Sequence, residues 1–190
     1  MAIDRPALVE AIWRGRARVA DSPVLSTVWV HPADLRPWPY DPAAARGLLE
    51  SRGFRDADSD GMLERGGKPF TVELVTTSNN QQRRDTLVLI QDQLRRAGIV
   101  VEPAFSEPSA WRAKVAAHDF DGALATWGID TALDLRYGFD SRDPQETNWG
   151  RYANPEVDRL LDEIDRQPAR AAAKAQVARL QHAVHEGQPY

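Results

Sequence analysis

Apolar positions recur at helical spacing in two stretches near the start of the chain. Asp4 can cap a first helix, which carries apolar side chains four residues apart and ends at Gly15. Asp41 can cap a second helix, which begins with a proline, carries an apolar stripe and ends at Gly53. Residues 19–40 lie between them, are rich in proline and show no helical period, so we expect an extended connector there.

The middle of the chain switches between period 2, typical of strands, and period 3.6, typical of helices. In order, the pattern predicts a hairpin with a two-glycine turn, a strand from Phe70, a helix over residues 82–97, a strand over 99–105, a short helix capped by Ser106 and a strand over 120–127. Crossovers of this kind favour parallel strands with right-handed connections. We therefore expect an α/β fold with a mostly parallel sheet flanked by helices.

Residues 128–150 follow the last predicted strand and show no sustained period. A loop of this length inside a compact domain is usually functional, so we expect it to contribute to a site. Two further helices are predicted beyond it. Asn154 caps the first, and the second covers roughly residues 169–185.

The composition narrows the class of protein. The chain has 190 residues, of which 42% are hydrophobic and 27% charged, as in an ordinary soluble domain with its own core. Its net charge of -4 argues against a nucleic-acid partner, which needs a basic face to displace counterions. No apolar run approaches the ~18 residues that cross a bilayer. The absence of cysteine excludes disulfides and thiolate chemistry.

Polar residues follow each of the three predicted parallel strands. In open α/β sheets, ligands bind beyond the carboxyl ends of the strands. The residues there are Thr77, Ser78 and Asn79 after the first strand, Ser106 and Glu107 after the second, and Trp127, Gly128, Ile129 and Asp130 after the third. The first group also precedes the long helix, whose free N–H groups can accept an anion or a ligand carbonyl. Turn formation and helix capping would select the same residue types, so both interpretations stay open.

Motifs of nucleophilic, zinc and nucleotide chemistry are absent from the sequence: it contains no G-x-S-x-G, H-E-x-x-H, G-x-x-x-x-G-K-[ST] or G-x-G-x-x-G. We therefore expect no cofactor and no catalytic site. A hydrolase that uses Asp130 and Asp134 as paired carboxylates is an alternative, although both lie in a loop where turns alone select aspartate.

An acidic segment begins like a calcium loop. Asp56, Asp58 and Asp60 stand at alternate positions and Gly61 follows, which matches D-x-D-x-D-G. The residue that should be a bidentate glutamate is Gly67, and a hairpin follows where an EF-hand has its second helix. We interpret the segment as an acidic turn and keep the three aspartates as a weak calcium candidate.

Several segments together resemble one protein family. In order along the chain they are AIDRPALVEAIWRG, PYDPAAARGLLESRGF, the D-x-D-x-D-G hairpin, VLIQDQLRRAGIVVE, HDFDGALATWGID and GRYANPEVDRLLDEI. The chain resembles the C-terminal portion of a family 5 extracellular solute-binding protein, the dipeptide, oligopeptide and nickel-binding class that serves ABC importers. The resemblance implies a periplasmic-binding-protein type II fold. Residues 1–190 would form its C-terminal ligand-binding lobe, with the N-terminal lobe absent.

The resemblance also implies a function. The parent protein would be a periplasmic or extracellular receptor that binds a peptide or a related small solute and delivers it to the permease subunits of an ABC importer. It would catalyse no reaction, and it would meet the membrane only through a lipid anchor or the importer. An alternative of a different class is the ligand-sensing domain of a transcriptional regulator.

The family's binding pattern maps onto the segment DFDGALATWGID. By resemblance, Asp130 would pair with the α-ammonium group of a peptide, and backbone groups around Trp127, Gly128 and Ile129 would hydrogen-bond the peptide like an added strand. Many peptide binders continue with Asp-Pro or Glu-Pro, whereas this chain continues TALDLRYGF. Ligand classes of other relatives, namely sugars, nickel chelates, opines and haem, therefore stay open, as does a role for Asp130 as a loop brace.

Overall fold

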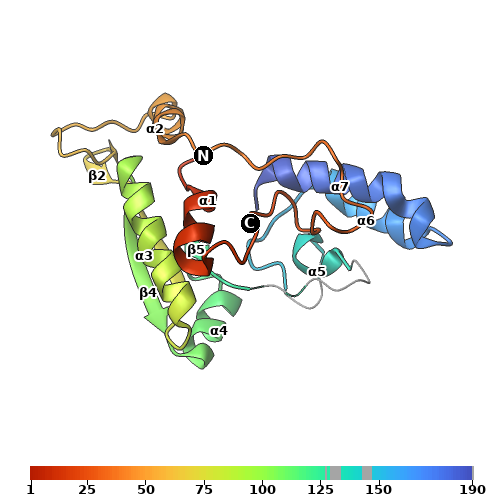
Figure 1. Ribbon diagram of the computed structural model, residues 1–190. Coiled ribbons are helices and arrows are strands. Elements are labelled where there is room, and N and C mark those ends of the chain that lie inside the picture. The colour runs from red at the N-terminus through yellow and green to blue at the C-terminus, as the bar shows by residue number, and fades with distance from the viewer. Residues whose placement is uncertain (127, 129–133, 143–146, 190) are drawn as a thin grey trace. The chain divides into compact units, whose positions relative to one another are not determined.

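The computed structural model describes residues 1–126, 128, 134–142 and 147–189 (Figure 1). The chain forms two compact units. The first contains Met1–Val19 and Trp38–Thr126, and the second contains Ala20–Pro37 and Trp127–Tyr190. Each unit buries apolar side chains of its own. That residues 1–190 make one lobe of a larger receptor stays a prediction.

The first unit is built on a three-stranded sheet in the order β4-β3-β5. The strands are β3 (Thr71–Thr77), β4 (Val100–Ser106) and β5 (Gly122–Ala123), and both neighbours run parallel to the central β3. Helices α3 (Gln81–Arg96) and α4 (Pro108–Ala116) make the two crossovers. The predicted order of strands and helices, and their parallel direction, are therefore confirmed.

Strand β5 is shorter than the sequence pattern predicts. Its ladder with β3 covers Gly122 and Ala123, and one further backbone bond joins Leu124 N to Val75 O at 2.9 Å. Gly122 allows the strands to approach, because a Cβ placed there would lie 2.6 Å from Cδ2 of Leu74. At Leu124 a side chain takes the place of the backbone donor, because the Thr76 hydroxyl donates to Leu124 O at 2.9 Å.

The remaining elements of the first unit lie close to where capping and turn motifs in the sequence predicted them. They are α1 (Arg5–Leu8), the π-helix η1 (Val9–Trp13), α2 (Pro42–Ser51), β1 (Glu64–Arg65) and β2 (Lys68–Pro69). Asp4 and Asp41 cap their helices as predicted, accepting hydrogen bonds from Ala7 N at 2.9 Å and Ala44 N at 2.8 Å. The predicted cap at Ser106 is wrong. Ser106 ends β4, and Glu107 occupies the N-cap position of α4 without a side-chain bond.

The second unit consists of helices around an apolar core. Its elements are α5 (Arg136–Phe139), α6 (Pro155–Asp165), the 3₁₀ helix η2 (Arg170–Ala173) and α7 (Lys174–Gly187). Asn154 caps α6 as predicted, through a bond from Glu156 N at 3.0 Å. The core is made by α6, α7, α5 and the segment 20–37, through residues such as Leu160, Leu180, Phe139, Val24 and Val30.

Residues 19–40 contain neither helix nor strand, yet they are more than a spacer. Val24 and Val30 are each 1% exposed. The fully buried amide of Gln181 in α7 donates to Val30 O at 3.0 Å and accepts from the Ser22 hydroxyl at 2.8 Å. Residues 20–37 of this segment therefore belong to the second unit and contribute to its packed core.

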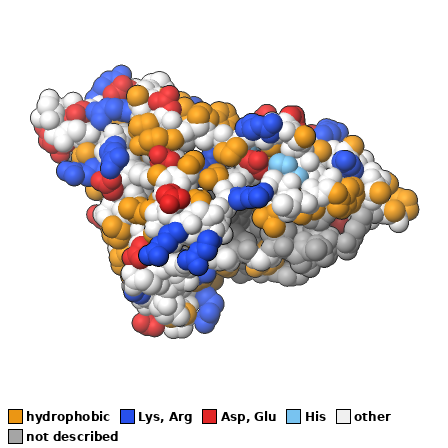
Figure 2. Space-filling model, viewed as in Figure 1, with side chains coloured by type: hydrophobic (Ala, Val, Ile, Leu, Met, Phe, Trp, Pro, Cys, Tyr) orange, Lys and Arg blue, Asp and Glu red, His pale blue; other side chains and the backbone are white. Residues whose placement is uncertain are grey.

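The surface carries charges of both signs. On the face shown in Figure 2, basic, acidic and apolar side chains are interspersed. Among the described residues, none of the helices combines the length and the apolar character needed to cross a bilayer.

Candidate functional site

The carboxyl ends of β3 and β4 bring two of the predicted polar groups together. Ser78 N donates to Ser106 O at 2.7 Å, and the Ser78 hydroxyl donates to Glu107 Oε1 at 3.0 Å. Thr77 is buried, Ser78 is half-buried and Asn79 is exposed. A rim of hydroxyl, amide and carboxylate groups therefore forms where α/β sheets usually bind ligands.

Helix α3 begins at this rim and contributes its first turn. Asn80 is its N-cap, and Asn80 Oδ1 accepts from Arg83 N at 3.0 Å. The cap satisfies one of the N–H groups that the sequence suggested as ligand donors. The capping role therefore belongs to Asn80, the residue that follows the predicted group.

Arg83 is a rim residue that the sequence reasoning missed. Its guanidinium reaches from α3 across the ends of two strands: one Nη donates to Thr126 Oγ1 at 2.9 Å, and the other to Thr77 Oγ1 at 3.4 Å. The sequence does contain an indication of this role, because a basic residue in the first turn of a helix is unfavourable next to the positive end of the helix dipole. A contact with another element of the fold is therefore expected for such a residue.

The third predicted group lies mostly outside the described residues. Gly128 is described and exposed, whereas Trp127, Ile129 and Asp130 are outside the described part of the chain, so their binding roles stay predictions. Asp134, the partner in the hydrolase alternative, is described. Its Oδ1 accepts from Arg136 N at 3.1 Å, which is the role of a turn-forming aspartate.

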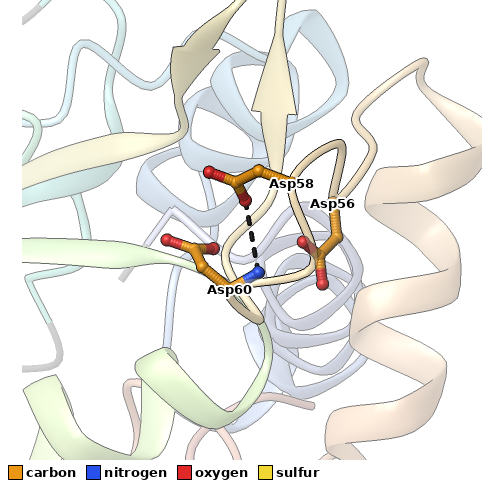
Figure 3. Close-up of side chains that lie close together, drawn as sticks. All are labelled: Asp56, Asp58 and Asp60. Carbon is orange, nitrogen blue, oxygen red and sulfur yellow. Dashed lines mark hydrogen bonds between the residues drawn. The ribbon is translucent and has the colours of Figure 1, made fainter.

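The acidic segment forms a tight loop (Figure 3). One carboxylate oxygen from each of Asp56, Asp58 and Asp60 lies within 4.8 Å of the others, the one such group of three among the described residues. Asp58 Oδ1 accepts from Asp60 N at 3.2 Å, and Asp60 Oδ1 accepts from Met62 N at 2.7 Å. These are the bonds of successive Asx-turns.

A basic side chain also compensates the charge of this loop. Arg46 of α2 lies 3.2 Å from Asp56 Oδ2 and donates to Gly61 O at 2.8 Å. Asp56 Oδ2 further accepts from Gly61 N at 3.1 Å. Each carboxylate therefore has a role within the loop itself, which favours the acidic turn; calcium binding at Asp56, Asp58 and Asp60 stays a weak candidate.

In the second unit, a cluster of arginines and aspartates joins α5 and the turn after it to α6. Arg142 Nε lies 2.9 Å from Asp140 Oδ1, and Arg142 also binds Asp162 at 3.0 Å. Arg136 binds Asp140, Asp162 and Asp165. The cluster secures residues 136–142 to α6.

These contacts perturb the acidic groups. Burial acts to raise the pKa of Asp140, but hydrogen bonds from Arg142 and Arg136 outweigh it and hold that pKa below its ordinary value. Hydrogen bonds from Arg142 and Arg136 also hold the pKa of Asp162 far below the usual range. Both carboxylates are thus ionised at neutral pH, which keeps the cluster assembled.

Comparison with known proteins identifies the family. The model for bacterial extracellular solute-binding proteins, family 5, middle part, matches residues 1–146. The chain therefore belongs to this family of solute-binding proteins. The oligopeptide-binding protein AppA of Bacillus subtilis is 29% identical over 100% of this chain, and the glutathione-binding protein GsiB of Pectobacterium atrosepticum is 28% identical over 83% of it.

Solved structures support the fold class. AppA of Bacillus subtilis in complex with a nonapeptide superposes with a TM-score of 0.91 over 100% of this chain and 38% of AppA, at 29% identity. NikZ of Campylobacter jejuni in complex with Ni(L-His) gives a TM-score of 0.86 over 99% of this chain and 38% of NikZ, at 25% identity. The type II periplasmic-binding-protein class, with its parallel sheet flanked by helices, is confirmed.

The chain spans about a third of the length of these relatives. It covers 36% of the AppA sequence and 30% of GsiB. What these relatives do as whole proteins therefore comes to these 190 residues only as a proposal.

Proposed function

We propose that this chain is the ligand-binding part of an extracytoplasmic receptor that delivers peptides, or a related small solute, to an ABC importer. Its membership of the solute-binding family supports a binding role without catalysis. The main support for a peptide ligand is the likeness to AppA, whose structure was solved with a nonapeptide. The match covers the full length of this chain. The parent protein would work in the periplasm or at the cell surface, next to the importer's permease subunits.

The proposed binding residues follow from the family pattern and from the rim. Asp130 would neutralise the α-ammonium group of the peptide, and backbone groups of Trp127, Gly128 and Ile129 would bind its main chain as an added strand. Thr77, Ser78 and Asn79 at the rim would also contribute to ligand binding. Main-chain recognition of this kind tolerates varied side chains, which suits a receptor for mixed peptides.

The positive charge at the N-terminus of a peptide gives a physical reason for assigning this role to Asp130. A peptide ammonium that enters a closing cleft loses water, and an unpaired charge there is costly. A carboxylate opposite it recovers the lost solvation. Closure of two lobes around the ligand would exclude water and strengthen the pairing, so we expect these 190 residues alone to bind peptides weakly.

Ligands that copurify with the longer protein test this proposal. We would purify the protein that contains this chain without refolding, release bound small molecules with acid and identify them by mass spectrometry. The proposal predicts a mixture of short peptides, and the emptied protein should bind a defined pentapeptide by calorimetry. A sugar or a metal chelate as the released ligand, with no peptide binding, would overturn the peptide assignment while leaving the family intact.

A further inference from the structure

The end of β5 is held by side chains after its backbone ladder stops. Leu124 N makes a bond to β3, at Val75 O, while Ala125 and Thr126 make no backbone hydrogen bond to β3 in the described part of the chain. From there, the Thr76 hydroxyl binds Leu124 O and the Arg83 guanidinium binds Thr126 Oγ1, both at 2.9 Å. The positions of Leu124 and Thr126 at the end of this segment therefore depend on polar side chains.

Arg83 joins three elements at this point. It stands in the first turn of α3 and donates to Thr77 at the end of β3 and to Thr126 just beyond β5. Its Nε is buried and has no hydrogen-bond acceptor among the described residues. An arginine in this place opposes the helix dipole and loses rotamer freedom, so its contacts to two hydroxyls must offset both costs.

Thr126 directly precedes the segment to which the proposed function assigns ligand contacts. We propose that Arg83 is a positioning residue, which bridges Thr77 and Thr126 and so fixes Thr126, the residue that directly precedes the proposed ligand-binding segment. This inference rests on the proposed function for its consequence, namely that the bridge preorganises the ligand-binding segment. Preorganisation raises affinity because less chain must be ordered when the ligand binds.

Four variants separate the bridge from general stability. Arg83→Gln removes the guanidinium, Thr126→Val removes the hydroxyl with little change of shape, and Thr126→Ser keeps the hydroxyl. Arg84→Gln is the matched control, because Arg84 is the next residue of the same helix and its side chain donates to Gln81 in its own turn. Thr126 is exposed, so its substitution leaves the core packing untouched.

Hydrogen exchange of the 190-residue chain, followed by mass spectrometry, reads the bridge directly. The expected result is exchange about five- to tenfold faster in the fragment 120–128 for Arg83→Gln and for Thr126→Val, equivalent to one lost hydrogen bond. The two changes combined should be no worse than Arg83→Gln alone, because the bond that Thr126→Val removes is already lost in Arg83→Gln. Thr126→Ser and Arg84→Gln should exchange like wild type. Wild-type exchange of this fragment in Arg83→Gln would overturn the proposal.

Peptide binding by the longer protein tests the consequence. Arg83→Gln should weaken binding of the pentapeptide about fivefold or more with an unchanged melting temperature, while Arg84→Gln should not. Faster exchange with undiminished affinity would overturn the link between the bridge and the ligand. A wild-type protein that binds no peptide would instead overturn the proposed function, and the exchange result would still decide whether Arg83 fixes Thr126.

Discussion

Replacing Asp140 with asparagine should destabilise the second unit, because Asp140 is the buried centre of its charge cluster. Its side chain is 7% exposed, whereas those of its partners Arg136 and Arg142 are 34% and 51% exposed. Asp140 Oδ1 accepts from Arg142 Nε and from Arg142 N, each at 2.9 Å, and Oδ2 accepts from Arg142 at 3.2 Å. Asparagine has the same shape but removes the charge that these donors face.

The magnitude follows from burial and from the number of remaining partners. Breaking a fully buried ion pair costs about 3–5 kcal/mol. Here both arginines are partly solvated and keep other acidic partners, Asp162 for both and Asp165 for Arg136, which reduces the loss. We expect Asp140→Asn to cost about 2 kcal/mol of unfolding free energy.

Urea denaturation monitored by circular dichroism measures this loss at neutral pH. The control is Asp165→Asn, since Asp165 belongs to the same cluster but its side chain is 59% exposed. The control should cost less than about 0.5 kcal/mol. Equal effects of the two substitutions, or no effect of Asp140→Asn, would refute the view that Asp140 is the centre of the cluster.

Three other consequences can be checked with the same chain. The pKa of Asp140 is lower in the folded state than in the unfolded state. Its contribution to stability is therefore full above the unfolded pKa of about 4 and is lost as pH falls through the lower folded value. In thermal melts at successively lower pH, Asp140→Asn should accordingly lose less stability than wild type. Gly187→Ala should lower the melting temperature, because its Cβ would lie 2.7 Å from the Tyr152 hydroxyl. Gly47→Ala lies inside α2, where a Cβ meets nothing within 4 Å, and should stabilise the protein by up to about 1 kcal/mol. The reverse order of the two melting temperatures would contradict the packing at α7. Calorimetry should detect at most weak Ca²⁺ binding, and micromolar affinity abolished by Asp58→Ala would disprove the acidic-turn interpretation.

Features with short-range causes were predictable from the sequence. Asp4, Asp41 and Asn154 cap helices through backbone N–H groups only two or three residues away, so their roles are visible in a few consecutive letters. The two-glycine hairpin turn is of the same kind, since Gly66 and Gly67 take φ values of 64° and 71°. The parallel sheet followed from the alternation of strands and helices.

Features with long-range causes were not predictable. The bond from Arg83 to Thr126 joins residues 43 apart, and the bond from Gln181 to Val30 joins residues 151 apart. The burial of the segment 20–37 also depends on α7, which lies far along the chain. The contacts of β5 with Thr76 and Leu74 on the neighbouring strand likewise join residues 48 apart, and the period of residues 120–127 does not show them. For the proposed ligand-binding segment, the assignment came from the resemblance to a family and not from periodicity, and it stays a prediction.

The central claim, a receptor that recognises the charged end of a peptide, depends most directly on Asp130. The measurement is a calorimetric titration of a free pentapeptide and its N-acetylated form against the longer protein, as wild type and as Asp130→Ala. Loss of one partner of a desolvated pair costs about 3–5 kcal/mol, so the substitution should weaken binding of the free peptide at least about a hundredfold. Acetylation should weaken wild-type binding similarly, with little further loss when both changes are combined. Wild-type affinity of Asp130→Ala for the free peptide would contradict the account.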